Sequence, residues 1–145
     1  MPIALLAGMG AQKLEQLIAW QLAHEFKVEV YRIVNTSRAA VKELEYRSQL
    51  FGAAASGESN VAEGFYRFAA ADFARFLGMA RASMGEARVR LLDGVDRGFF
   101  ERADCEEALR LADRAMACAV SLKTSLEPFM AKRSPNAKRG RGPGT

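Results

Sequence analysis

Histidine and cysteine are scarce in this chain of 145 residues, which has one histidine and two cysteines. A di-metal centre of the ferritin type needs a Glu-x-x-His pair on each of two helices, and His24 alone cannot supply both. Cys105 and Cys118 are far apart in sequence, and neither belongs to a CxxC pair. The scarcity therefore argues against a metal site or a disulfide framework and predicts two buried free thiols.

Catalytic signatures are also missing from the sequence. Gly52 and Gly57 have the spacing of a phosphate-binding loop, but they lack the Lys and the Ser or Thr that complete it. There is no nucleophile elbow. Glu63 and Glu86 are the one conceivable carboxylate pair, and carboxylates at such positions in a bundle usually bond to an arginine or a helix end. We therefore expect no enzymatic activity and no cofactor.

Long apolar runs are absent too. None approaches the roughly 18–20 residues that span a bilayer, and the apolar segment 1–10 lacks the basic start and the length of a signal peptide. Hydrophobic residues make up 50% of the chain and charged residues 26%, as in soluble globular proteins. The sequence predicts a cytoplasmic protein with no membrane partner and a chain long enough to bury a core.

Positive charge is concentrated at the end of the sequence. The chain has 21 basic and 17 acidic residues, and the segment 131–145 contains five of the basic residues and no acidic one. The remainder, with 16 basic against 17 acidic, is nearly neutral. Glycine and proline in 131–145 predict a disordered basic tail after a single domain of residues 1–130. Such a tail can bind nucleic acid or serve only as a solubilising end. Its basic residues are Lys132, Arg133, Lys138, Arg139 and Arg141.

Apolar residues recur at three- and four-residue steps in four segments, and this period predicts four helices. The first helix has an apolar stripe that includes Leu14, Leu17, Ile18, Leu22, Phe26, Val30 and Val34. Capping residues at 35–37 then start a second helix over 38–62, and Gly64 is predicted to end it as a left-handed cap.

The third and fourth helices follow short connections. The third carries the stripe Phe73, Phe76, Leu77, Ala80, Met84, Ala87 and Leu91, and a loop at 94–98 ends it. Asp104 and Glu107 have the spacing of a capping box that opens the fourth helix, and Pro128 ends that helix. No strand-like alternation bounded by turn signals is found. The pattern predicts an all-α fold, an antiparallel up-down-up-down four-helix bundle.

The second predicted helix contains a polar stripe among very small residues. Gln49, Ser56, Asn60 and Glu63 lie near a heptad line, beside Gly52 and Gly57. Two glycines inside a helix cost about 1 kcal/mol each relative to alanine, so a closely packed neighbour is expected. We expect Asn60 and Glu63 to point inward, toward Ser83, Glu86 or Arg67, and Ser56 and Gly57 to face residues 80–84.

The segment 60–64, Asn-Val-Ala-Glu-Gly, resembles the N-I-A-E-G signature of a bacterial family encoded in intervening sequences of 23S ribosomal RNA genes. The similarity covers about 17–100. It includes Trp20-Gln21, Ala23, Tyr31, Gln49-Leu50, Ala53, Ser56, Arg67, Asp72-Phe73, Arg75-Phe76-Leu77, Ala80, Ser83 and Glu86. Phe51 and Gly52 replace two arginines common in the family, which puts a nucleic-acid surface on that face in doubt.

The resemblance implies a homopentamer of four-helix bundles arranged as a barrel. The related accessory variability protein of diversity-generating retroelements has this architecture, binds nucleic acid and works with a reverse transcriptase. By this analogy the implied partners are other copies of the chain, RNA or DNA, and a protein such as a reverse transcriptase.

Two functions stay open at this point. The first is a non-enzymatic, nucleic-acid-binding accessory protein that uses the tail and surface arginines without base-specific readout. The second is a protein–protein interaction scaffold whose tail is incidental. An RNA affinity that falls steeply with salt separates the two, because phosphate contacts release counterions. The arginines expected to contribute are Arg67, Arg75, Arg81, Arg88 and Arg90.

Overall fold

The computed structural model describes residues 3, 8 and 10–130. Within these ranges the protein is all helical and has no strand, which confirms the predicted fold class. The long helices are α2 (Ile18–Thr36), α3 (Leu44–Phe65), α4 (Ala70–Asp96) and α5 (Arg102–Leu126). The short 3-10 helices are η1 (Leu14–Gln16), η2 (Ala40–Lys42) and η3 (Glu127–Phe129).

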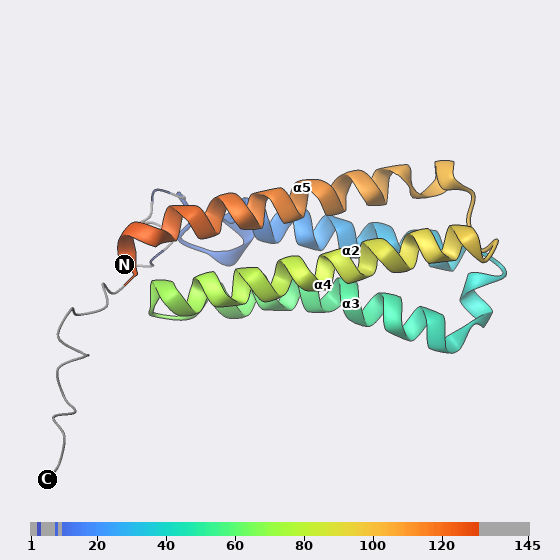
Figure 1. Ribbon diagram of the computed structural model, residues 1–145, viewed down its shortest axis with the longest axis horizontal. Helices are drawn as coiled ribbons and strands as arrows, with labels where there is room; N and C mark the ends of the chain where they lie inside the picture. Colours follow the sequence, from blue (N-terminus) through green and yellow to red (C-terminus); the bar gives the residue numbers. More distant parts are fainter. Residues whose placement is uncertain (1–2, 4–7, 9, 131–145) are drawn as a thin grey trace, which may run out of the picture.

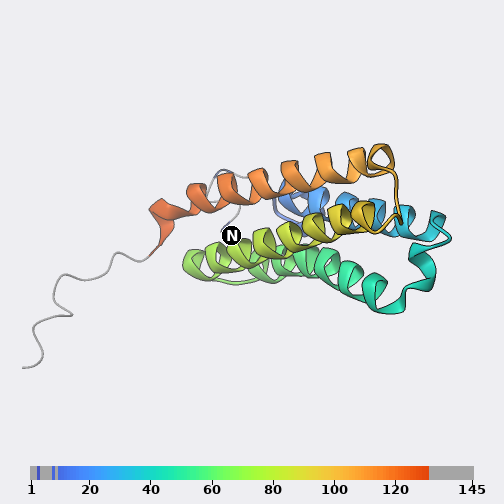
Figure 2. The ribbon, with the colours of Figure 1, turned by 45° about the vertical axis from the view of Figure 1, so that its right-hand side comes forward.

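The long helices pack side by side as a closed ring. α2 contacts α3 and α5, and α4 contacts the same two helices from the other side. Consecutive helices run in opposite directions, so the arrangement is the predicted up-down-up-down bundle (Figures 1 and 2). The α3–α4 connection and the end of α5 lie at one end of the bundle, and the other two interhelical connections lie at the opposite end.

The core is formed by the predicted apolar stripes, with one exception. Every stripe residue predicted for the third helix is buried, from Phe73 to Leu91. Ile18 was expected to join the core but is 61% exposed, whereas its neighbours Leu17 and Ala19 are buried. Helix α2 begins at Ile18, and the helical period then directs Ala19 and Leu22 inward. The prediction that Ile18 joins the core was therefore wrong, and its neighbours Leu17 and Ala19 are buried instead.

Gly64 does not end its helix as a left-handed cap. It lies inside α3, which continues to Phe65. Its φ is not positive, unlike that of Gly98. A Cβ at Gly64 would lie 2.8 Å from Phe73 Cδ2 and 2.9 Å from Phe76 Cβ. Glycine is needed here because α4 crosses close to the backbone of α3.

Other helix ends also differ from the prediction. The second helix starts at Leu44 rather than at 38, after the separate turn η2. α4 runs through Gly94 to Asp96, and the left-handed turn falls on Gly98 (φ +79°). α5 begins at Arg102, and no capping side chain bonds its first turn, so Asp104 is an ordinary first-turn acid rather than an N-cap. The spacing of residues along the sequence does not distinguish these helix ends from the predicted ones.

Candidate nucleic-acid interface

The polar stripe on α3 lies along its seam with α4, as expected for its central residues. The hydroxyls of Ser56 and Ser83 are 2.9 Å apart. A Cβ at Gly57 would lie 2.6 Å from Met84 Cγ, so this glycine permits the close approach of the two helices. Gly52 is different, because a Cβ there would meet no described atom within 4 Å. A closely packed neighbour was expected at both glycines, and it is found at Gly57 but not at Gly52.

The inward orientation predicted for Asn60 and Glu63 is not what the structure shows. The Asn60 side-chain amide is half-buried and donates to the Ser56 carbonyl (2.8 Å) and hydroxyl (3.1 Å), within its own helix. Glu63 is exposed and accepts a hydrogen bond from Arg67 at 3.2 Å. Val61 and Gly64 take the core-facing positions of this turn, which leaves Glu63 on the solvent side.

The remaining stripe residues are joined by an arginine that sequence analysis placed on a nucleic-acid surface. Arg90 donates to Glu86 at 2.9 and 3.1 Å and to Gln49 at 2.7 Å, linking α4 to α3. Glu63 and Glu86 therefore bond to different arginines and form no carboxylate pair. No buried side-chain polar atom of the described residues lacks a partner. The polar groups of the stripe are thus hydrogen-bonded along the edge of the α3–α4 seam.

The predicted binding arginines separate into two groups. Arg67 and Arg75 both lie over the ring of Phe76, at 4.8 and 4.6 Å from its centroid, and each pairs with a nearby acid, Glu63 or Asp72. Arg81 and Arg88, seven residues apart, lie on the side of α4 that faces α5. The four do not form one continuous patch.

On the side of α4 that faces α5, one arginine is paired with an acid and the other is not. Arg88 is held by Asp113 of α5 at 2.8 Å. Arg81 is exposed and forms no ion pair with any described residue, and the same holds for Lys123 on α5. The Lys123 ammonium lies 3.5 Å from the Cβ position that Gly78 leaves empty, so it reaches across to α4.

A shallow hollow of about 330 Å³ lies between α4 and α5 at this point. Its lining residues are Leu77, Gly78, Arg81, Ala119, Val120 and Lys123. Sequence analysis missed Lys123, because a lone lysine on a helix has no motif. The available signal was the position of Lys123 on the polar face of the predicted fourth helix. That Lys123 lies beside the same hollow as Arg81 depends on the register of α4 against α5, which the sequence does not show.

The five basic residues of the predicted tail, Lys132, Arg133, Lys138, Arg139 and Arg141, lie outside the described residues. The last described residues before that segment pack on the bundle. η3 packs against α4 and α5, and the described chain ends at Met130, at the end of the bundle that holds the α3–α4 connection (Figure 1).

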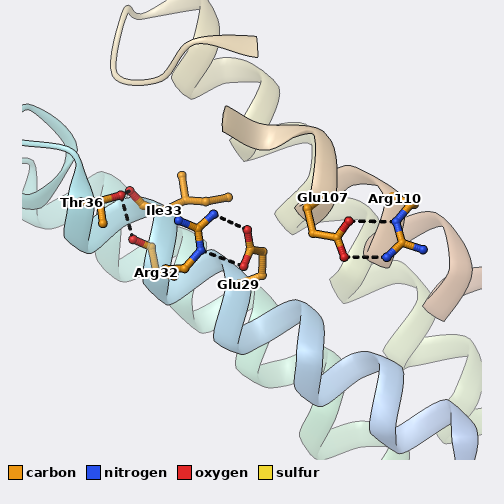
Figure 3. A network of polar contacts seen from close by, with 6 residues as sticks. All are labelled: Glu29, Arg32, Ile33, Thr36, Glu107 and Arg110. Atoms are coloured by element: carbon orange, nitrogen blue, oxygen red, sulfur yellow. Dashed lines mark hydrogen bonds and ion pairs between the residues drawn. The ribbon is translucent and has the colours of Figure 1, made fainter. Parts of the chain in front are cut away.

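The face between α2 and α5 also carries arginines, but their electrostatic arrangement is different. Arg32 bonds to Glu29 and Arg110 bonds to Glu107, in both cases three residues away on the same helix (Figure 3). The hydrogen bond from Arg110 lowers the pKa of Glu107, and the one to Glu29 raises the pKa of Arg32. Arg32 and Arg110 are each paired with an acid on their own helix, whereas Arg81 and Lys123 are not paired with any described acid.

A hollow of about 490 Å³ at the opposite end of the bundle also has charges of both signs. Arg32 and Arg38 line it together with Glu101 and Asp104. The Ser37 hydroxyl at its edge donates to the Phe99 carbonyl at 2.8 Å, which ties α2 to the α4–α5 connection. With two acids beside two bases, this hollow does not select an anion.

His24 has a partner that its sequence neighbourhood did not reveal. Its Nδ1 atom is 3.2 Å from Glu58 Oε2, and Lys27 Nζ is 2.6 Å from the same oxygen. The ring of Trp20 stacks on His24 at 4.9 Å. The cluster joins α2 to α3, and the described residues contain no group of ligating side chains that could hold a metal.

The two cysteines are free among the described residues, as predicted. Cys105 is fully buried, while Cys118 is partly exposed. Burial raises the pKa of both thiols, which favours their protonated form.

In the described part of the chain, no helix is long and apolar enough to cross a bilayer. A comparison with curated proteins gives no match. A comparison with protein families matches residues 15–120 to the model described as the 23S rRNA-intervening sequence protein. That match covers well over half of the sequence and includes all four long helices except the last turns of α5. The chain belongs to the 23S rRNA-intervening sequence protein family.

Proposed function

We propose that this protein is a non-enzymatic accessory protein that binds RNA through the basic face between α4 and α5 and through the segment 131–145. The observation that carries the proposal is the pair Arg81 and Lys123, exposed beside one hollow and without an acidic partner among the described residues. The bundle also ends where five further basic residues begin. The family's description, which refers to 23S rRNA, agrees with an RNA target.

The mode of binding follows from the chemistry of these groups. Lysine and arginine side chains neutralise phosphates, and the release of condensed counterions supplies most of the free energy. Such contacts hold the backbone of a nucleic acid and carry no sequence information by themselves. The proposal is therefore an RNA-binding protein whose α4–α5 face has little base specificity and whose affinity falls steeply with salt.

Self-association is the second part of the proposal. The family resemblance supports a homopentamer, and Ile18, Leu44 and Val89 are large apolar side chains exposed by more than 60% that a neighbouring copy could cover. A pentamer would present five copies of the basic segment, so avidity would strengthen binding. Light scattering at micromolar concentration is expected to give five chains, and a monodisperse monomer would contradict it.

The cellular setting is proposed by analogy. We place the protein in the cytoplasm, in contact with RNA and with a protein partner of the reverse transcriptase kind, as for the related accessory variability protein. The competing function is a protein-interaction scaffold in which the basic residues are incidental.

Fluorescence anisotropy with a labelled RNA, measured over a range of salt, tests the proposal. We compare the full chain with a variant that lacks 131–145, using circular dichroism to confirm that both are folded. The deletion is expected to weaken binding and flatten the salt dependence, since each phosphate contact contributes about 0.7–0.9 to the slope. If the full chain binds RNA without salt dependence or does not bind it, the scaffold function is favoured instead.

A further inference from the structure

The connection between α3 and α4 exposes two aromatic rings that the fold does not use. We call residues 66–69 the α3–α4 tip. Phe68 is fully exposed (101%) and Tyr66 is 67% exposed. Burying a large aromatic side chain stabilises a fold, and both rings forgo most of this gain. Phe65, which precedes them, is buried and holds the Tyr66 ring edge-on at 5.2 Å.

Two cations flank the tip in fixed positions. The guanidinium groups of Arg67 and Arg75 lie over the ring of Phe76, which is buried at the start of α4. Arg67 uses one terminal nitrogen for Glu63, and its other N–H groups have no acceptor among the described residues. These arginines are held by the ring and the acids while keeping donors free for a phosphate oxygen.

The tip also lies at the end of the bundle where α5, which carries Lys123, ends. The α3–α4 connection and the end of α5 are adjacent in both views (Figures 1 and 2). Arg81 is eleven residues beyond the start of α4 at Ala70, about 16 Å along the helix at about 1.5 Å per residue. A flexible polyanion can therefore contact the tip and the hollow between α4 and α5 at the same time.

We infer that the α3–α4 tip is a base-stacking site for single-stranded RNA, with Phe68 and Tyr66 as the platform and Arg67 and Arg75 as phosphate contacts. Unpaired bases stack on exposed aromatic side chains, whereas the bases of a duplex are already stacked on each other. Arg67 and Arg75 each have a paired acid, so the uncompensated positive charge comes from Arg81 and Lys123, and it favours RNA over an apolar protein partner. This inference rests on the proposed RNA binding and adds to it a preference for unpaired segments.

Phe68→Ala tests the platform, because a ring exposed to this extent contributes little to folding. The affinity for a short single-stranded RNA should fall roughly 5- to 150-fold, the range for the loss of one base–aromatic stack. The salt slope should not change, since no charge is removed. Phe68→Trp should keep the affinity. Val28→Ala, a matched loss of an exposed apolar side chain on α2, should have no effect.

Several results would overturn the inference. One is a Phe68→Ala protein that binds single-stranded RNA like the parent while the basic-segment deletion weakens binding; the proposed function would then stand without the stacking site. An equal loss for single-stranded and duplex RNA would exclude stacking. A change in oligomer size on Phe68→Ala would assign the tip to subunit contact. If the parent binds no RNA at low salt, the inference and the proposed function both fail.

Discussion

The seam between α3 and α4 and the face between α4 and α5 share one helix but differ in chemistry. Along the seam, Gly57 and Gly64 bring the two backbones together, and the polar side chains at its edge bond to one another. On the other face, Arg81 and Lys123 meet no acid among the described residues. The family signature at 60–64 lies on the seam. Its buried residues Val61 and Gly64 serve packing, Glu63 is exposed, and the candidate binding residues lie outside the signature.

The largest expected loss of stability comes from a substitution that pushes α3 and α4 apart at their seam. Gly57→Leu would drive a side chain into Met84, which is fully buried. Overpacking of this kind costs about 1–3 kcal/mol, which exceeds the gain of up to about 1 kcal/mol in helix propensity. Thermal unfolding followed by circular dichroism should show a lower Tm.

Gly52→Leu is the matched control, since the same substitution there meets open space. It should raise stability by about 0.5–1 kcal/mol through helix propensity alone. Equal effects of the two substitutions on Tm would contradict the close approach at Gly57.

A smaller effect is expected from the polar edge of the seam. Asn60→Leu removes two hydrogen bonds to Ser56 but leaves the Ser56–Ser83 contact in place. The loss should be about 0.5–1.5 kcal/mol in the free energy of unfolding, measured with urea. Glu63→Leu, at an exposed site, should change it by less than about 0.5 kcal/mol. A larger loss for Glu63 than for Asn60 would reverse the assignment of the inward side.

The smallest effect concerns the α2–α5 face. The pKa of Glu107 is lower in the folded protein than its ordinary value of 4.5, because Arg110 donates to it. The pair therefore stabilises the fold above that value, and the contribution is lost as the pH falls through the lower folded pKa. Glu107→Gln should slightly reduce stability at pH 7 and leave it unchanged at the acidic limit. A loss of the same size at pH 7 and at the acidic limit would contradict this contribution of the pair.

Much of the bundle could be predicted from the sequence. The three-to-four period placed Phe73 through Leu91 in the core, and the small residues at 53–57 indicated a close neighbour near 80–84. Helix ends were predicted less well, because a glycine such as Gly64 serves either as a cap or as a point of close approach. The difference depends on where Phe73 and Phe76 lie, which local sequence does not show.

The candidate interface was predicted only in part. Arg67, Arg75, Arg81 and Arg88 were named from their residue type, but ion pairs and helix register divide them. Asp113 of α5 forms an ion pair with Arg88. Lys123 of the same helix adds a second cation beside the hollow that Arg81 lines. Phe68 gave no signal in the sequence, because an aromatic residue near apolar stripes is usually part of the core.

The most direct test of the account is the salt dependence of RNA binding for the full-length double variant Arg81→Glu, Lys123→Glu. Charge reversal should weaken binding strongly and reduce the slope of log K against log salt by at least about 1.4, the value for two lost phosphate contacts on a single strand. Arg32→Glu, Arg110→Glu, with the same change in charge on the α2–α5 face, should cause a clearly smaller loss. Equal losses for the two double variants would contradict a binding site between α4 and α5.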